Sequence, residues 1–252
     1  MKQRVRAVHY EHPTLGPISA ERVQPNQVDE SLAYQVRRLI GVAYNREFES
    51  ELTPPNVRLP LGRISGAYIR STPEQIEAQH TRIEKAIAGG SAYWLLRLTH
   101  SVEDANDDRL DALTKTTPSR ESWLQKLHAT SPNCYVDDIL VRPPSPVAPG
   151  VQNKGIGSMM LHAALKYDER YQHTATIVAD TYRSGYSGPR FFDENGFELQ
   201  REIVPPLTVF NRGESGEIHV PMDRREAELD VVLARLAVRH EWLNTAEVEY
   251  IA

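Results

Sequence analysis

The feature that most constrains this chain is a glycine-containing loop between a strand-like and a helix-like segment. Residues 134–142 (CYVDDILVR) have the pattern of a strand that ends at Pro143. Gly155 and Gly157 then precede a helical pattern, with Met160, Leu161, Ala164 and Leu165 on one side. Glycine lets the backbone approach a ligand closely, and N–H groups at a helix start favour an anion. The segment therefore fits either a phosphate-binding loop or a tight turn without a ligand, and for a Gly-x-Gly pair taken alone the tight turn is favoured because such pairs are common.

Two common phosphate loops are excluded by single residues. A dinucleotide-binding fingerprint requires its third glycine at position 160, which is Met160. A Walker A loop starting at Gly150 requires Lys and Ser or Thr after Gly155, where Ile156 and Gly157 stand. Neither nucleotide-binding motif is present at this loop.

The remaining pattern predicts a mixed α/β chain. Asp29 caps a first helix, and Thr72, Pro73 and Gln75 form the start signature of a second. Strands are expected at 18–23, 91–99, 134–142 and 174–179, a helical turn at 191–192, an antiparallel pair at 197–204 and 217–222, and a helix at 224–243. Residues 103–111 are expected to be a solvated acidic insertion, and 119–130 fit either a strand or a short helix.

Composition excludes several classes of protein. The net charge of the 252-residue chain is −5, which does not favour general nucleic-acid binding. The one cysteine cannot form an internal disulfide, and no apolar run is long enough to span a membrane. The basic start lacks a following apolar stretch, so we expect no secretory signal and a cytoplasmic protein. His9 and His12 lack clustered Cys or carboxylate partners, so no metal site is expected.

The loop Gln152-Asn153-Lys154-Gly155-Ile156-Gly157 resembles the acetyl-CoA loop of the GCN5-related N-acetyltransferase (GNAT) superfamily, whose signature is Gln/Arg-x-x-Gly-x-Gly/Ala. In family order, residues 135–141 resemble the fourth strand, and residues 191–197 (FFDENGF) are similar to the family's FYEKxGF segment. The resemblance is firm over 134–222 and thin over 18–133.

The resemblance implies an α/β (α+β) fold, with a mixed, mostly antiparallel central sheet flanked by helices and an extra C-terminal helix. It implies a domain over residues 18–222, between an N-terminal arm (1–17) and a C-terminal helical extension (223–252). We expect the extension to be packing, with a homodimer interface as the alternative.

The resemblance also implies acetyl-CoA as co-substrate. Backbone N–H groups along the loop are expected to hold its pyrophosphate, and the strand's backbone to bind the pantetheine arm and polarise the thioester carbonyl near Leu140. The implied binding residues are Ile139, Leu140, Val141, Gln152, Asn153, Lys154, Gly155, Ile156, Gly157 and Ser158.

The implied reaction is direct acetyl transfer to a primary amine, which is a small molecule or a peptide, within a ternary complex. Asp137 and Asp138 are the candidate bases, and because strand neighbours face opposite sides only one is expected to face the site. An ion pair with an arginine is the alternative for either. The family's tyrosine acid corresponds to Phe192, so Tyr182 and Tyr186 become candidate acids, with packing as their alternative.

Two other functions fit the same residues. One is a non-catalytic acyl-CoA-binding regulatory module, because Phe192 cannot donate a proton. The other is an interaction protein that reuses the fold. Cys134 would allow a covalent intermediate, but a lone cysteine among apolar neighbours is usually inert core.

Overall fold

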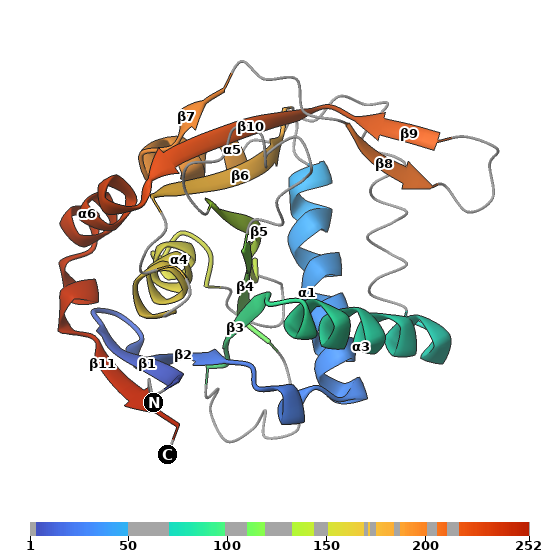
Figure 1. Cartoon of the computed structure of the whole chain (residues 1–252), viewed down its shortest axis with the longest axis horizontal. Coiled ribbons are helices and arrows are strands. Elements are labelled where there is room, and N and C mark those ends of the chain that lie inside the picture. The colour runs from blue at the N-terminus through green and yellow to red at the C-terminus, as the bar shows by residue number, and fades with distance from the viewer. Residues whose placement is uncertain are drawn as a thin grey trace.

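The computed structural model describes residues 4–49, 71–98, 110–118, 133–143, 151–168, 171, 175–183, 187–200, 206–210 and 217–251. Its main feature is a nine-stranded sheet in the order β11-β1-β2-β3-β4-β5-β6-β10-β7, beside a separate β8–β9 pair (Figure 1). All neighbouring strands run antiparallel except β5 and β6, which are parallel.

The element bounds are as follows. The strands are β1 Val5–His12, β2 Gly16–Arg22, β3 Ala92–Leu96, β4 Ala112–Pro118, β5 Asn133–Val141, β6 Thr176–Tyr182, β7 Glu198–Leu199, β8 Leu207–Phe210, β9 Glu217–Val220, β10 Met222–Glu228 and β11 Glu247–Tyr250. The α-helices are α1 Glu30–Glu49, α3 Pro73–Ala88, α4 Ile156–Tyr167, α5 Ser187–Glu194 and α6 Leu229–Arg239, with short 3₁₀ turns η1 Pro25–Gln27 and η4 Glu241–Thr245.

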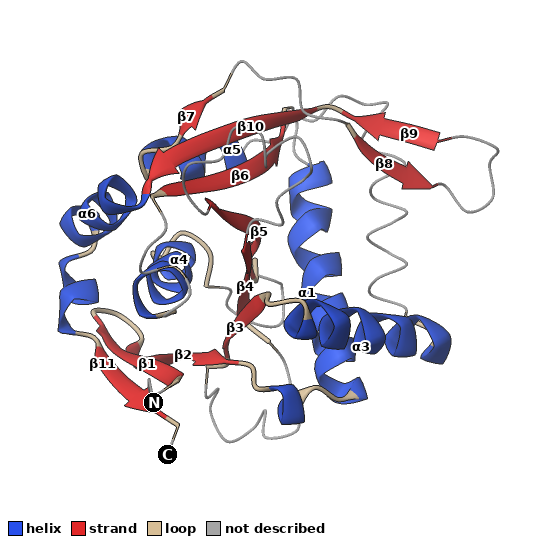
Figure 2. Ribbon diagram, in the orientation of Figure 1, coloured by secondary structure: helices blue, strands red, loops and turns tan. Residues whose placement is uncertain are grey.

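Helices cover both faces of the sheet. The curved sheet and α6 surround α4, whereas α1 and α3 lie on the opposite face (Figure 2). Nine of the twelve residues of α4 are buried, so this helix has no extended polar face. The apolar residues divide accordingly into a core around α4 and a smaller core beneath α1 and α3. The predicted fold class, a mixed and mostly antiparallel sheet flanked by helices with a further C-terminal helix, is confirmed.

Both predicted helix starts are confirmed by their caps. The Leu32 N–H donates to Asp29 Oδ1 at 2.7 Å before the first turn of α1. At α3, the Gln75 N–H donates to Thr72 Oγ1 and the Thr72 N–H donates to Gln75 Oε1, which is the complete capping box. None of the described helices is both long and apolar enough to cross a membrane.

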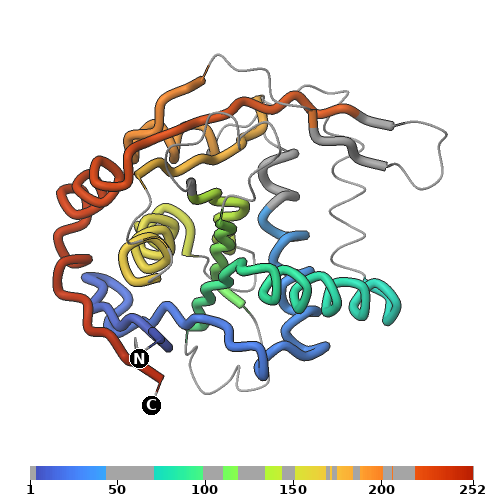
Figure 3. The backbone as a smooth tube through the Cα atoms, viewed as in Figure 1, coloured from blue at the N-terminus to red at the C-terminus, as the bar shows by residue number. Residues whose placement is uncertain are grey.

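The first and last described strands form one edge of the sheet. Residues 5–12 lie in the segment expected to be a loose arm, with an edge strand at 5–8 as the alternative. They form β1, which pairs with β2 on one side and β11 on the other. The two ends of the chain therefore lie close together (Figure 3). Val8 and Tyr10 are buried, so the alternating pattern of β1 belongs to a packed strand. The sequence reasoning did not predict β11.

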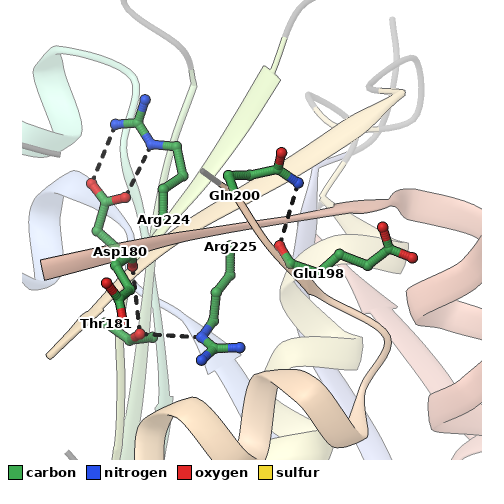
Figure 4. A network of polar contacts seen from close by, with 7 residues as sticks. Asp180, Thr181, Glu198, Gln200, Arg224 and Arg225 are labelled. Carbon is green, nitrogen blue, oxygen red and sulfur yellow. Dashed lines mark hydrogen bonds and ion pairs between the residues drawn. The ribbon is translucent and has the colours of Figure 1, made fainter. Parts of the chain in front are cut away.

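The C-terminal helix begins at Leu229 rather than near 224, because β10 occupies residues 222–228. The charged sequence Arg-Arg-Glu-Ala-Glu suits a helix by propensity, but β6 and β7 flank it and fix its side chains. Arg224 forms an ion pair with Asp180 at 3.1 Å. On the opposite face, Arg225 donates to Thr181 (Figure 4). Sheet pairing has overridden local propensity here.

One further expectation about strands was wrong, and one strand was not predicted. The predicted pair of 197–204 with 217–222 is replaced by β7 with β10 and β8 with β9. Strand β4, which was not predicted, joins β3 to β5. Asp111, expected to be solvated, is fully buried and accepts from the Leu98 N–H at 2.9 Å. Residues 119–130 and most of the acidic segment lie outside the described residues.

Candidate functional site

Strands β5 and β6 separate soon after they pair. β6 partners are found only for the first three residues of β5, Asn133 to Tyr135, although β5 continues to Val141 (Figure 1). The later residues of β5 remain paired with β4 on the other side. Backbone groups of β5 beyond Tyr135 that face away from β4 therefore have no β6 partner within the described residues.

The glycine loop leads from the end of β5 to α4. The Val151 N–H donates to the Arg142 carbonyl at 3.1 Å and closes the base of the loop. Asn153 and Gly155 both adopt left-handed backbone, with φ of 62° and 77°. Gly155 is the residue before the first turn of α4, and as a glycine it has no side chain with which to cap that start. The N–H groups of the first turn, which have no partner within the helix, are thus left for another acceptor.

Packing within the protein also explains why glycine occupies positions 155 and 157. A Cβ at Gly155 would lie 2.9 Å from His240 Cε1, closer than real side-chain contacts. A Cβ at Gly157 would lie 3.2 Å from Phe191 Cε2 and 3.6 Å from Ile139 Cγ2. A larger residue would therefore require His240 to shift at position 155 and Phe191 to move slightly at position 157, whether or not a ligand binds.

The predicted binding residues differ in how exposed their side chains are. Asn153 and Lys154 are exposed, and Gln152 is half-buried. The side chains of Ile156, Ser158 and Leu140 are buried, so these three residues can offer a ligand only their backbone. The other predicted positions, Ile139, Val141, Gly155 and Gly157, are half-buried.

The two aspartates lie at an irregularity in β5. Lys115 is opposite Asp138 and Thr116 is opposite Val136, so Asp137 is an extra residue on β5. Such a bulge interrupts the alternation of side chains between the two faces of a strand. Asp137 accepts from Thr117 Oγ1 and lies 3.2 Å from Lys115 Nζ. Its partner is thus a lysine, whereas an arginine was the expected alternative.

The charges of both aspartates affect the pKa of the same buried tyrosine, Tyr93. Burial raises the pKa of Tyr93 well above its ordinary value, and the negative charges of Asp138 and Asp137 raise this pKa further. The Lys115 ammonium lies 6.0 Å from the centre of the Tyr93 ring. Asp138 stands opposite Lys115 and Asp137 lies 3.2 Å from the Lys115 ammonium, so the bulge brings both aspartates to the same lysine, contrary to the expectation that strand neighbours face opposite sides. We call Tyr93, Lys115, Thr117, Asp137 and Asp138 the bulge cluster.

Of the two candidate acids, the structure describes only Tyr182. Tyr182 is the half-buried last residue of β6, opposite Met222. Tyr186 lies outside the described residues. Phe192 is buried, with its ring centre 4.9 Å from that of Phe197. Cys134 is fully buried in the core around α4, which fits the prediction of a packing role.

Sequence reasoning missed two residues that contact the glycine loop, His12 and His240, and a third, Trp242, that packs against His12. His12 Nε2 lies 2.7 Å from the Lys154 carbonyl oxygen, and the His12 ring packs against Trp242 at 4.7 Å between ring centres. His240 lies against Gly155. The positions belong to segments at the two ends of the sequence, and no motif signals that they meet.

Comparisons with known proteins concern the fold. No family model and no curated protein matches the sequence. Among solved structures, an uncharacterised protein from Bacillus halodurans aligns at 10% identity over 96% of this chain and 98% of its own, with a TM-score of 0.52.

Two other solved structures align with lower TM-scores. The spermidine/spermine N-acetyltransferase SpeG from Vibrio cholerae aligns at 11% identity over 86% and 97%, with a TM-score of 0.48. The PaiA N-acetyltransferase from Thermoplasma acidophilum, in complex with coenzyme A, aligns at 12% over 83% and 99%, with a TM-score of 0.46. This chain therefore shares its overall fold with the uncharacterised Bacillus halodurans protein, and in it the diverging parallel strands β5 and β6 are connected by the glycine loop and α4.

Proposed function

We propose that this chain is a GNAT-superfamily N-acetyltransferase that transfers the acetyl group of acetyl-CoA directly to a primary amine in a ternary complex. The observation that carries the proposal is the separation of β5 from β6 after Tyr135, next to the uncapped start of α4. Backbone donors and acceptors along β5 and at the helix start thus face one region, which suits a ligand with amides and a diphosphate. Solved structures of similar fold include one described in complex with coenzyme A.

The loop supplies the anion site. The N–H groups of residues 152–158 hold the pyrophosphate, and the start of α4 favours negative charge through its dipole. Lys154 is exposed and adds a positive charge at the same place. Along β5, the backbone of Ile139 to Val141 binds the pantetheine arm, and an N–H near Leu140 stabilises the oxyanion of the thioester carbonyl.

The bulge cluster supplies the base. An amine of pKa about 10.4 is protonated at neutral pH and must lose a proton before it attacks. Asp137 or Asp138 accepts that proton, directly or through water, and Lys115 at 3.2 Å stabilises the Asp137 carboxylate. The amine nitrogen then forms a bond to the thioester carbon, the carbon–sulfur bond breaks, and the leaving thiolate takes up the proton that the nitrogen loses as the amide forms.

The leaving thiolate does not require Phe192. This residue is buried among aromatic rings, so it stands in the core rather than at a proton-transfer position. A thiol of pKa about 8.5 is a tolerable leaving group without help. Tyr182 and Tyr186 remain the proposed acids if one acts.

Calorimetry and a thiol-release assay test the proposal in sequence. Coenzyme A should bind the purified protein, and acetyl-CoA should release thiol with at least one member of a panel of polyamine, aminoglycoside and lysine-peptide amines. Absence of binding at millimolar coenzyme A refutes the proposal. Binding without thiol release on any amine favours the non-catalytic acyl-CoA-binding module.

Single substitutions identify the base. Asp137→Asn or Asp138→Asn should lower kcat by about 10²- to 10⁴-fold, the usual contribution of a general base. Asp180→Asn is the matched control, because Asp180 lies on β6, the strand next to β5, and forms its ion pair with Arg224 of β10. It should leave kcat within about threefold. A loss in the control as large as in the other two would contradict the assignment.

A further inference from the structure

Segments from both ends of the chain converge on the glycine loop. His12 is the last residue of β1, and Trp242 belongs to η4. The His12 ring lies against Trp242, and His240 lies against Gly155 from the same C-terminal segment. The loop therefore rests on a surface formed by His12, His240 and Trp242, which we call the loop support.

The hydrogen bonds of His12 fix the orientation of its ring. His12 Nδ1 accepts from the backbone N–H groups of Thr14 and Leu15, both at 3.1 Å, and so carries no proton. The ring proton is therefore on Nε2, which donates to the Lys154 carbonyl oxygen at 2.7 Å. His12 is only 5% exposed, so water competes little for this bond.

The bond to Lys154 also sets the direction of the next N–H group. The Lys154 carbonyl and the Gly155 N–H belong to one peptide unit, and no peptide bond in the described residues is cis. In a planar trans unit the two groups point in opposite directions. Because the carbonyl points towards His12, the Gly155 N–H points away from β1, on the side of the loop that His12 leaves open.

A second contact holds β1 against α4. The Tyr10 hydroxyl hydrogen-bonds to His162 Nδ1 at 3.0 Å, and both side chains are buried. The ring of Tyr10 packs against that of Trp242, with 5.8 Å between ring centres. β1 thus contacts the helix through His162 and the preceding loop through Lys154, which fixes the loop relative to the helix.

We propose that His12 is a positioning residue for the anion site: through Lys154 it orients the loop peptide so that the N–H groups at the start of α4 converge on one anion. The inference rests on the proposed binding of acetyl-CoA at this loop. His12 does not touch the ligand; it lowers the cost of ordering the loop when the pyrophosphate binds.

Two substitutions at position 12 separate the two bonds of the ring. His12→Gln retains an N–H donor near the place of Nε2, whereas His12→Asn retains an acceptor near the place of Nδ1 and loses the donor to Lys154. His9→Asn is the matched control, because His9 lies on the same strand but is exposed and bonds to Ser19. Melting curves of all three variants report any general loss of stability.

The first readout is hydrogen exchange of amides 152–158 in the protein without ligand. His12→Asn should accelerate exchange by about three- to tenfold, whereas His12→Gln should stay within about twofold of wild type, as should His9→Asn. Equal exchange in the Asn and Gln variants, raised or unchanged, overturns the proposal. If His12→Asn does not fold, Trp242→Leu replaces it with the same expected increase, and unchanged exchange overturns the proposal.

The second readout is kinetic. His12→Asn should raise KM for acetyl-CoA by about three- to tenfold with kcat within about twofold, and His12→Gln should restore KM. A fall in kcat at unchanged KM overturns the positioning role. If wild-type protein does not bind coenzyme A, the proposed function fails, and the exchange data alone still decide whether His12 orders the loop.

Discussion

Gly155→Ala is the substitution whose effect the structure determines best, because a matched position exists. Gly16 and Gly155 have nearly the same left-handed backbone, with φ of 72° and 77°. An added Cβ meets nothing within 4 Å at Gly16, but at Gly155 it would lie 2.9 Å from His240 Cε1. The two alanine variants share the backbone strain and differ in the contact with His240.

The magnitudes follow from these two contributions. A non-glycine residue in the left-handed region costs about 1–2 kcal/mol, partly offset by the reduced freedom of the unfolded chain. Overpacking a filled site costs about 1–3 kcal/mol more. We therefore expect a loss of unfolding free energy of about 1 kcal/mol for Gly16→Ala and about 2–4 kcal/mol for Gly155→Ala.

Urea unfolding measures both losses, and a double-mutant cycle with His240→Ala assigns their difference. Removing the imidazole should recover about 1 kcal/mol or more of the Gly155→Ala loss. Calorimetry should also show weaker binding of coenzyme A by Gly155→Ala than by Gly16→Ala. Equal losses in the two alanine variants, or no recovery in the double variant, would refute the reasoning from packing.

Three other predictions concern buried residues. Burial lowers the pKa of His162 from 6.5 to about 4, and the charge of Lys166 contributes to this shift. Between these two pH values the unfolded chain binds more protons than the folded protein, so the free energy of unfolding falls as the pH falls. In His162→Asn the amide can still bond to Tyr10, but the titrating imidazole is gone. Urea unfolding at pH 8 and pH 5 should therefore show a smaller loss of unfolding free energy in this variant than in wild type, by on the order of 2 kcal/mol. Cys134→Ala should keep thiol release within about threefold, because a buried thiol has no access to the thioester; a stable acetyl adduct on Cys134 in mass spectra would contradict direct transfer. Phe192→Tyr should not raise kcat and should lower the unfolding free energy by about 1–3 kcal/mol, since its hydroxyl would enter a core of aromatic rings; a tenfold gain in kcat would show that position 192 reaches the thiol.

The sequence predicted those features of the fold that depend on residues close together in the chain. The caps at Asp29 and Thr72 and the glycine loop before α4 depend on residues within a few positions, and each is present as expected. Strand β4 escaped prediction because its sequence, ALTKTTP, has neither strong alternation nor strong hydrophobicity. Its identity as a strand comes from pairing with β3 and β5, which no local pattern records.

The candidate site shows the same division. The glycine loop follows from its own residues, but the arrangement of Asp137 and Asp138 does not. The β5 bulge depends on how β5 registers with β4, and its effect is to bring Lys115 to Asp137. His12 and Trp242 meet only because the sheet joins β1 to β11. Such long-range pairings are properties of the folded sheet, so a single sequence gives no sign of them.

The pairing of β1 with β11 has a consequence for how the protein is made. Arg6 and Glu249 form an ion pair at 3.0 Å although 243 positions separate them. At a ribosomal speed of about 5–20 residues per second, β1 waits roughly 10–50 s for this neighbour to be synthesised. During that interval one side of the strand is an open edge on which a foreign strand can add. Shielding of this edge until β11 emerges would prevent such addition, and the loop support likewise waits for the synthesis of His240 and Trp242.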